Sequence, residues 1–345
     1  MDARGGGLEQ VLRRWATHLS TVHEVVMVSH RWTRPGERPL RIAQSASADP
    51  YDTVPVRRTA ELAEVLRSIA PDVVSLHNRP QWWVEVPSAA QVVVTFHNFS
   101  QAWKLNAADL RSVRAAAAGG ALRASAVSAA LADAAGAVLA APVAITPPSI
   151  GAAFFASFPR RPERMVLSPN RLMAKKGVLE LLDIARRPEF AAVQFSFADL
   201  ISPWTRATQE HRSLRLAIDG VANAGRFRPA QSPDELVERY RRCAVVACVV
   251  NEPEGLGLVA LEAQACGAPL VTTDLGGLRE ATFAPNACVA PGDPTALASA
   301  LADALLRSQE SCEAPRTEVA LRFTPEASGE QFRKWVERSL RPGAV

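Results

Sequence analysis

The sequence has few cysteines, and none stand in the spacing of a redox or metal motif. There are five, an odd number, and no two form a Cys-x-x-Cys pair. Because no secretory signal opens the sequence, we expect these thiols to be reduced and to fill the core. This pattern argues against a disulfide-stapled secreted domain and favours a cytoplasmic protein.

Long apolar runs are also missing. No stretch of 18 apolar residues occurs, and the Ala-rich segment 115–145 is interrupted by Arg123 and Asp133. Alanine forms helices but anchors weakly in lipid. We therefore expect a soluble protein, with peripheral contact to the inner membrane surface left open.

The charge is mild, at a formal +4 over 345 residues. Nucleic-acid binders gather Lys and Arg on one face, so this balance argues against such a partner. It is compatible with an anionic small molecule. No Asp-x-Asp follows an expected strand, and no His/Cys cluster has ligand spacing, so we expect no metal ion and no cofactor.

The chain is long enough, and apolar enough at 48% hydrophobic residues, for two cores. Short β-branched runs alternate with longer amphipathic segments, which is typical of α/β folds with parallel sheets. The expected strands are His23–Ser29, Asp72–Leu76, Gln91–Phe96, Met165–Ser168, Val193–Phe197, Ala244–Val250 and Pro269–Thr273. The expected helices are Leu8–Ser20, Thr59–Ile69, Gly177–Ala185, Pro233–Arg242, Leu258–Cys266 and Pro294–Arg307, the last capped by Asp293.

A proline-rich stretch with little periodicity divides the sequence at 146–162. It predicts an N-terminal Rossmann-like domain over 1–145 and a C-terminal nucleotide-binding domain over 163–345, with a last helix that could pack back on the first domain. Two such doubly wound domains bind ligands where their strands end, in a central cleft.

The start of the chain breaks the Rossmann pattern. A Gly-rich turn, Gly5-Gly6-Gly7, comes almost at Met1, whereas such a turn normally follows the first strand of the sheet. We therefore expect the first strand of this domain to be missing. We expect either residues upstream of Met1 that supply the strand, which we favour, or a domain built with a gap.

The strongest chemical signal is Glu254-Gly-Leu-Gly-Leu-Val-Ala-Leu-Glu262, placed between a strand and a helix. Backbone N–H groups at a helix start suit a phosphate, and Gly255 and Gly257 allow close approach. The Glu262 carboxylate can accept two hydrogen bonds side by side, as a ribose diol donates. Two solvated glutamates on an amphipathic helix are the alternative, which the strand–turn–helix context disfavours.

A second loop, Asn170-Arg-Leu-Met-Ala-Lys-Lys-Gly177, follows another expected strand. The guanidinium of Arg171 and the ammonium of Lys176 could stabilise negative charge that builds on a leaving diphosphate. Alone, these residues would read as a surface turn with two solvated cations.

These motifs resemble the retaining glycosyltransferases of family 4, which have the GT-B fold. The family carries Glu-Gly-Phe-Gly-Leu-x-x-x-Glu followed by an Ala/Cys-Gly-x-Pro turn, and this chain has Ala265-Cys-Gly-Ala-Pro269 after its glutamates. The likeness continues through Asp274-Leu-Gly-Gly-Leu-Arg-Glu280 and in the Arg/Lys loop. Asn170 replaces the family's usual glycine.

The resemblance implies roles for these residues. Glu254 would contact the donor sugar near its reacting carbon, Glu262 would bind ribose, and Gly255, Leu256, Gly257 and Leu258 would line the donor site. Arg171 and Lys176 would hold the diphosphate. In the first half, Gly6 and Gly7 would lie near the donor phosphate.

His97, at a strand end, would lie close to the transferred sugar and hydrogen-bond to it; a satisfied structural histidine is the alternative. His77, Asn78, Arg79 and Pro80 at the preceding strand end are expected on the acceptor side. Arg226 and Phe227 are candidates for a wall of the nucleobase site, although Phe227 could equally belong to the core.

The sequence thus predicts a metal-independent hexosyltransferase. It would use a nucleotide-diphosphate sugar, either a UDP-sugar or GDP-mannose, and a glycan or lipid-linked acceptor. Two alternatives stay open: a sugar-nucleotide epimerase, and a truncated or non-catalytic protein that binds nucleotide sugars.

Overall fold

The computed structural model describes residues 7–30, 52–56, 59–99, 105–156, 159–200, 208–228, 232–309 and 312–340. The chain divides into two units, each built from more than one stretch of sequence. The first unit holds Met1–Leu8 and Ile150–Thr324, and the second holds Glu9–Ser149 and Pro325–Val345. Within the described part, no helix has the length and apolar character to cross a bilayer.

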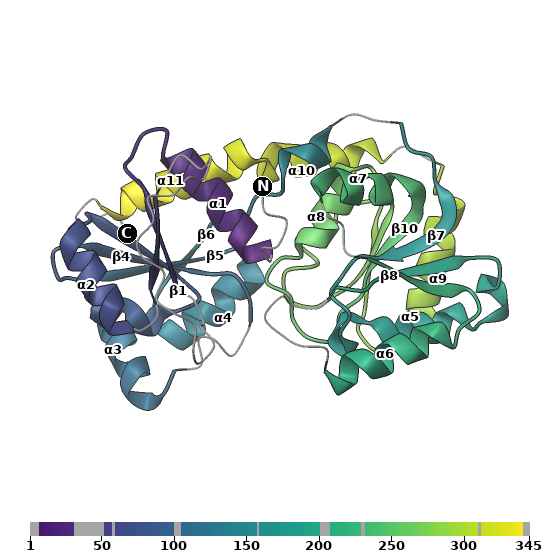
Figure 1. Cartoon of the computed structure of the whole chain (residues 1–345), viewed down its shortest axis with the longest axis horizontal. Helices are drawn as coiled ribbons and strands as arrows, with labels where there is room; N and C mark the ends of the chain where they lie inside the picture. Colours follow the sequence, from purple (N-terminus) through teal and green to yellow (C-terminus); the bar gives the residue numbers. More distant parts are fainter. Residues whose placement is uncertain are drawn as a thin grey trace. The chain divides into compact units, whose positions relative to one another are not determined.

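In its described residues the first unit is built on one parallel sheet of six strands (Figure 1). The strands are β7 (Glu163–Ser168), β8 (Gln194–Ala198), β9 (Ala224–Phe227), β10 (Cys243–Cys248), β11 (Leu270–Thr273) and β12 (Ala287–Val289). Their order is β12-β11-β10-β7-β8-β9, so the chain builds the sheet outward from β7 in one direction and from β10 in the other. Doubly wound sheets bind ligands at such a switch point, beyond the carboxyl ends of the two central strands.

Helices connect and cover these strands: α5 (Val178–Ala185), α6 (Gln209–Asp219), α7 (Pro233–Arg242), α8 (Leu258–Ala265), α9 (Pro294–Leu306) and α10 (Glu313–Phe323). Short 3-10 turns lie at η3 (Ala152–Phe155), η4 (Ala174–Lys176) and η5 (Pro188–Phe190). The prediction that Asp293 caps α9 is confirmed, because its carboxylate accepts hydrogen bonds from the N–H groups of Thr295 and Ala296.

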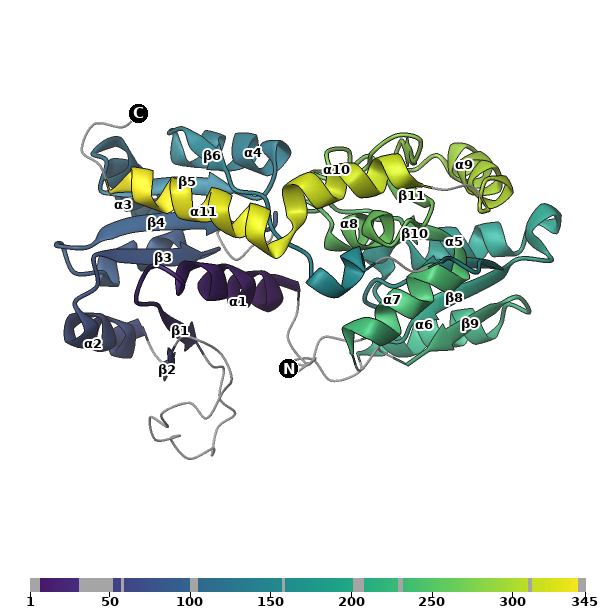
Figure 2. The same cartoon turned by 90° about the horizontal axis from the view of Figure 1, so that it is seen from above.

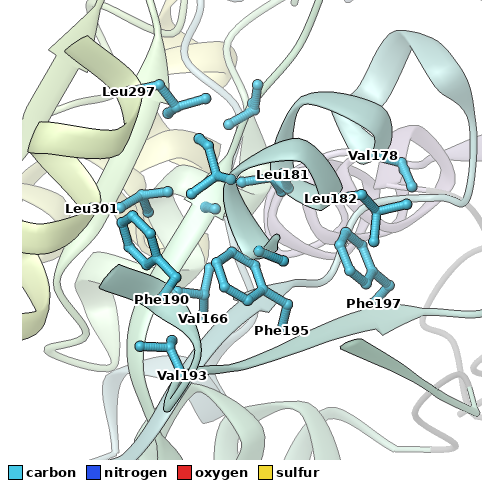
Figure 3. Packing of buried hydrophobic residues seen from close by; sticks show 14 of the residues in the cluster. Val166, Val178, Leu181, Leu182, Phe190, Val193, Phe195, Phe197, Leu297 and Leu301 are labelled. Carbon is cyan, nitrogen blue, oxygen red and sulfur yellow. The ribbon is translucent and has the colours of Figure 1, made fainter. Parts of the chain in front are cut away.

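A continuous apolar cluster fixes this unit (Figure 3). Phe195 on β8 and Phe190 on η5 are almost fully buried, with ring centroids 6.0 Å apart in an edge-on arrangement. Leu181 and Leu182 of α5 and Leu301 of α9 pack into the same cluster. The strands are buried by helices, which explains their near-continuous apolar sequences.

The described residues of the second unit form two separate parallel sheets. One pairs β1 (Val26–His30) with β2 (Asp52–Val56), and the other has the order β3-β4-β5-β6. The latter strands are β3 (Val73–His77), β4 (Gln91–Phe96), β5 (Leu122–Ala126) and β6 (Val143–Ile145). Its helices are α1 (Gly7–Leu19), α2 (Thr59–Ile69), η1 (Pro80–Glu85), α3 (Ala107–Ala118), α4 (Ala129–Leu139) and α11 (Pro325–Ser339).

The division of the second unit's strands into two sheets follows the Rossmann order. In the order 3-2-1-4-5-6 the first strand lies between the second and the fourth. Among the described residues the first element is helix α1, and the sheet is divided between β1 and β3. The division therefore falls at the position that the first strand has in that order.

Helix α11 packs beside α1 in the second unit, as Figure 2 shows (yellow and purple). The rings of Trp15 and Phe332 stack with centroids 4.1 Å apart and planes 7° from parallel. The indole N–H of Trp15 donates to Ser328 Oγ at 2.7 Å, and that hydroxyl donates to the carbonyl oxygen of Pro147 at 2.6 Å. These contacts tie helix α11 to helix α1.

Candidate active site

Two loops leave the carboxyl ends of the central strands β7 and β10 and touch each other. The backbone N–H of Asn251 donates to the carbonyl oxygen of Lys175 at 2.9 Å. Gly177 has φ +69°, and a Cβ on it would lie 2.4 Å from Val249 Cγ1. Only glycine allows this approach, so the two loops meet at the switch point of the sheet.

An ion pair between Lys176 and Glu254 joins these loops. The Lys176 side chain is 11% exposed and that of Glu254 27% exposed. Burial lowers the pKa of Lys176 to about 8, and the positive charges of Arg171 and Lys175 act in the same direction. The structure thus brings two predicted catalytic residues together, with the ammonium already partly desolvated.

Glu254 is held by a second glycine turn, Gly276-Gly277, which follows β11. It forms a parallel bridge with Gly276, and the N–H of Gly277 donates to the Glu254 carbonyl oxygen at 2.9 Å. Gly257 has φ +99°, and a Cβ there would come within 2.4 Å of Leu278 Cδ2. The two glycine turns therefore pack as one body around Glu254.

Helix α8 begins at Leu258, and its N-cap, Gly257, has no side chain to accept the first N–H groups. Gly255 and Leu256 are buried just before it. The predicted donor-binding stretch therefore ends in uncapped backbone donors, which favour an anion.

Glu262, one turn into α8, is oriented by a buried tyrosine. Tyr240 of α7 is fully buried and donates its hydroxyl to Glu262 Oε2 at 2.9 Å. Burial, followed by the negative charge of Glu262, raises the pKa of Tyr240 well above 10, so it stays a donor. Tyr240 could not be predicted from the sequence, because it lies 22 residues from Glu262 on another helix and the two residues share no motif.

Arg171 and Asn170 flank the ion pair. Arg171 is exposed, and its charge reaches Lys176 strongly enough to depress the lysine pKa. The amide nitrogen of Asn170 contacts Cys248 Sγ at 3.9 Å at the end of β10. The loop thus carries both of its predicted cations.

The predicted nucleobase wall forms contacts within the protein. The Arg226 guanidinium contacts Asp199 at 2.9 Å and Asp219 at 2.9 Å. The ring of Phe227 lies 4.2 Å from the guanidinium carbon of Arg239. Both side chains are structurally engaged at the outer strand β9, and their role toward a base stays a prediction.

Asp199 was not among the predicted site residues. It follows β8 and is held by Arg215 and Arg226, whose hydrogen bonds and charges lower the pKa of its carboxyl against the opposing effect of burial. The near-buried ring of His211 lies 3.2 Å away. This cluster orders the carboxyl end of β8.

The residues predicted from the first half belong largely to the second unit. His97 follows β4 and is half-buried. Gly7 is the first residue of α1, whereas Gly6 lies outside the described residues. Among the residues described, no group of three or more His, Cys, Asp or Glu side chains could hold a metal ion.

The two units and their parallel sheets define a two-domain, Rossmann-like protein. Solved structures share this fold over nearly the whole chain. A glycosyltransferase from Rickettsia africae is 16% identical with a TM-score of 0.79, covering 98% of this chain and 96% of its own. Sucrose-phosphate synthase from Thermosynechococcus elongatus is 17% identical with a TM-score of 0.77, covering 98% and 95%. The predicted GT-B fold is confirmed.

Two family descriptions match the sequence in turn. "Glycosyltransferase Family 4" matches residues 5–152, and "Glycosyl transferases group 1" matches residues 151–319. The chain belongs to the group 1 glycosyltransferases, with the family 4 domain in its N-terminal half. The family predicted from the motifs is therefore confirmed.

Curated relatives match over shorter segments. The D-inositol 3-phosphate glycosyltransferase of Acidothermus cellulolyticus is 50% identical over 78 residues, covering 22% of this chain and 17% of the relative. The enzyme of the same name from Frankia alni is 43% identical over 97 residues, covering 27% and 23%. The matched segments thus span less than a quarter of these relatives' length.

Proposed function

We propose that the protein is a retaining glycosyltransferase that moves a hexose from a nucleotide-diphosphate sugar to an acceptor hydroxyl. The observation that carries this proposal is the Lys176–Glu254 ion pair, formed by two loops at the switch point of the first unit's sheet. The bond that breaks joins the sugar to the diphosphate. The lysine can bind the diphosphate on one side of it, and the carboxylate can bind the sugar on the other.

Lys176 and Arg171 bind the diphosphate and stabilise the negative charge that builds on it as the glycosidic bond breaks. Lys176 is suited to this task because it is mostly buried, and charge interactions strengthen as water is excluded. The uncapped start of α8 supplies backbone donors to the same group. These groups perform the charge stabilisation without a divalent ion.

Glu254 binds the hydroxyls of the transferred sugar, and Glu262 binds the ribose diol. Before donor binds, Lys176 neutralises Glu254; when the diphosphate takes the ammonium, the Glu254 carboxylate becomes available to the sugar. The acceptor hydroxyl attacks on the face that the diphosphate leaves, and a departing phosphate oxygen takes its proton. This sequence of steps retains the anomeric configuration.

Relatives support the choice of substrates. A fold neighbour from Anabaena was solved with UDP-glucose, at 16% identity and a TM-score of 0.70, which supports a nucleotide-sugar donor. The curated relatives are named for an inositol phosphate acceptor. From the sequence we predicted a glycan or lipid-linked acceptor, reached by peripheral contact with a membrane surface. The test therefore includes an inositol phosphate as well as acceptors of this class.

The decisive experiment screens UDP- and GDP-sugars for release of nucleoside diphosphate. Each is offered with D-inositol 3-phosphate, oligosaccharides or a lipid-linked sugar, and proton NMR reads the product's anomeric configuration. We expect an acceptor-dependent release and a retained configuration. Glu254→Gln should lower kcat by about 100-fold, since removing one transition-state contact costs that order.

Glu252→Gln is the matched control, because Glu252 lies in the same loop but is exposed and pairs with Lys175 at 2.8 Å. It should keep the wild-type rate. Full activity in Glu254→Gln would refute the assignment. Conversion of the donor to its epimer without acceptor would instead favour the epimerase, and tight binding without turnover would favour a non-catalytic protein.

A further inference from the structure

The second unit contains a polar row on one face of its four-stranded sheet. His77 on β3 pairs in register with Thr95 on β4, and Thr95 pairs with Ser125 on β5. Residues two apart on a strand share a face, so Ser75 and His97 belong to the same face. Thr95 Oγ1 and Ser125 Oγ lie 3.0 Å apart, fully buried.

At the carboxyl end of this row the two histidines contact each other directly. His77 Nδ1 and His97 Nε2 are 3.0 Å apart, and Ser75 Oγ lies 3.2 Å from His77 Nε2. One proton must lie on the line between the two rings, because two facing lone pairs or two facing N–H groups would repel. Ser75, His77 and His97 thus form one chain of hydrogen bonds.

The surroundings keep this pair neutral. Burial lowers the pKa of His77 to about 4, and burial together with His77 lowers that of His97 well below 6.5. The aromatic ring of Trp15 lies 5.5 Å from His97 and 6.2 Å from His77, centroid to centroid. Phe332 of α11 lies 6.3 Å from His77. Aromatic rings therefore flank both half-buried imidazoles.

An asparagine in the left-handed region fixes the backbone of His97. Asn78 is 5% exposed and adopts φ +57°, a conformation that asparagine takes more readily than most non-glycine residues. Its side-chain oxygen accepts the His97 N–H at 2.8 Å, and its own N–H donates to the Thr95 carbonyl oxygen at 3.0 Å. Ring and backbone of His97 are thus each held by a residue at the end of β3.

We propose that His77 is a positioning residue for His97: it occupies Nε2 of that ring and leaves Nδ1 as the nitrogen that bonds to a substrate hydroxyl. Since the two rings share one proton, their tautomers are coupled. If His97 carries its proton on Nε2, so does His77, which then donates to Ser75 Oγ. If Ser75 donates instead, both rings carry the proton on Nδ1.

This coupling gives the site an adaptable hydrogen-bonding group. Rotation of the Ser75 hydroxyl reverses the chain, so that His97 Nδ1 offers either a donor or an acceptor without any change of net charge. A sugar or polyol hydroxyl can be bound in either sense. The role of His97 toward a substrate rests on the proposed function, whereas the tautomer coupling does not.

The test combines kinetics with nitrogen NMR on the full chain carrying ¹⁵N-histidine. Two-bond proton–nitrogen spectra at neutral pH should give the same tautomer for His77 and His97. His77→Leu should shift the His97 nitrogen signals and lower kcat of transfer between about 10- and 100-fold, as misplaced catalytic groups do. The KM for donor should change much less.

His77→Asn should recover most of the rate, because its amide can donate or accept near the position of Nδ1. His23→Gln is the control, since His23 is 43% exposed and its ring contacts Glu337 at 3.1 Å. Opposite tautomers in the wild type, or unchanged His97 signals and kcat in His77→Leu, would overturn the proposal. If His77→Leu does not fold, the wild-type tautomers and the His77→Asn rate still decide.

The two proposals fail in different ways. Absence of transfer with every donor and acceptor would refute the proposed function but leave the tautomer measurement intact. Transfer with uncoupled tautomers would refute the role of His77 and leave the glycosyltransferase assignment standing.

Discussion

Tyr240 donates its hydroxyl to Glu262 at 2.9 Å from a fully buried position on α7. The bond orients the carboxylate that we assign to the donor ribose. It also couples α7 to α8, since the two residues lie on those helices. Edge-on contact with Phe154, at 6.0 Å between centroids, completes the packing of the Tyr240 ring.

We therefore predict that Tyr240→Phe weakens donor binding. Hydrogen bonds to charged groups contribute about 1.5–3 kcal/mol, so the Kd for nucleoside diphosphate should rise about 10-fold or more. Calorimetry measures the Kd directly. Acceptor KM should stay unchanged, and an unaltered Kd would show that Glu262 is positioned by other contacts.

The pKa of Lys176, lowered to about 8 by burial, predicts an alkaline limb in the rate profile. The protonated ammonium binds the diphosphate, so kcat/KM should fall as pH rises through about 8 in the free enzyme. A lysine at its usual pKa of 10.5 would keep its charge throughout that range.

Lys176→Arg separates charge from shape in this profile. Guanidinium stays protonated, so any residual activity of the variant should lack the limb near pH 8. A limb that persists in Lys176→Arg would assign the titration to another group. Measurements of kcat/KM between pH 6 and 10 at constant ionic strength provide the comparison.

Gly177→Ala should destabilise the first unit. Its φ of +69° strains any side chain, and the added Cβ would lie 2.4 Å from Val249 Cγ1 and 2.8 Å from the Val249 carbonyl oxygen. Backbone strain alone costs about 1–3 kcal/mol, and the clash adds to it. Urea unfolding followed by circular dichroism measures the loss.

Gly292→Ala is the matched control for this change. Gly292 has a similar φ of +75°, but a Cβ there meets nothing within 4 Å. It should lose only the strain contribution. Equal losses in both variants would show that the loops separate without cost, and that contact between them does not hold the site together.

Elements with strong apolar or amphipathic patterns were predictable. Gln91–Phe96, Thr59–Ile69 and Pro233–Arg242 match β4, α2 and α7 at both ends. β4 is a run of β-branched residues, and α7 begins with a proline and ends with arginines, so their boundaries are clear in the sequence. The expected strand at His23–Ser29 is three residues early, because β1 begins at Val26.

The Ala-rich segment concealed more structure than its sequence indicated. It contains the end of α3, strands β5 and β6, and helix α4. Strand β5 reads Leu-Arg-Ala-Ser-Ala, which has little β propensity and forms a strand because it is buried between β4 and β6. Alanine offers no contrast between faces, so periodicity could not reveal these elements.

Site residues that belong to a recognisable loop motif were predictable. The residue spacing within two such motifs predicted Lys176 and Glu254, and the fold brings these two residues together. The Tyr240–Glu262 and His77–His97 contacts were not predictable, because they depend on which helices and strands are neighbours in the fold. That information comes from register, such as His77 opposite Thr95, and a single sequence does not carry it.

The last helix has a practical consequence for protein engineering. Because α11 carries the Phe332 that stacks on Trp15, neither unit is encoded by one uninterrupted stretch. In a chimera of two parents joined near Ser149, these two rings would come from different parents. Helix α11 must therefore come from the same parent as the N-terminal half. Exchange of donor specificity between related enzymes should therefore graft residues 150–324 as an insert.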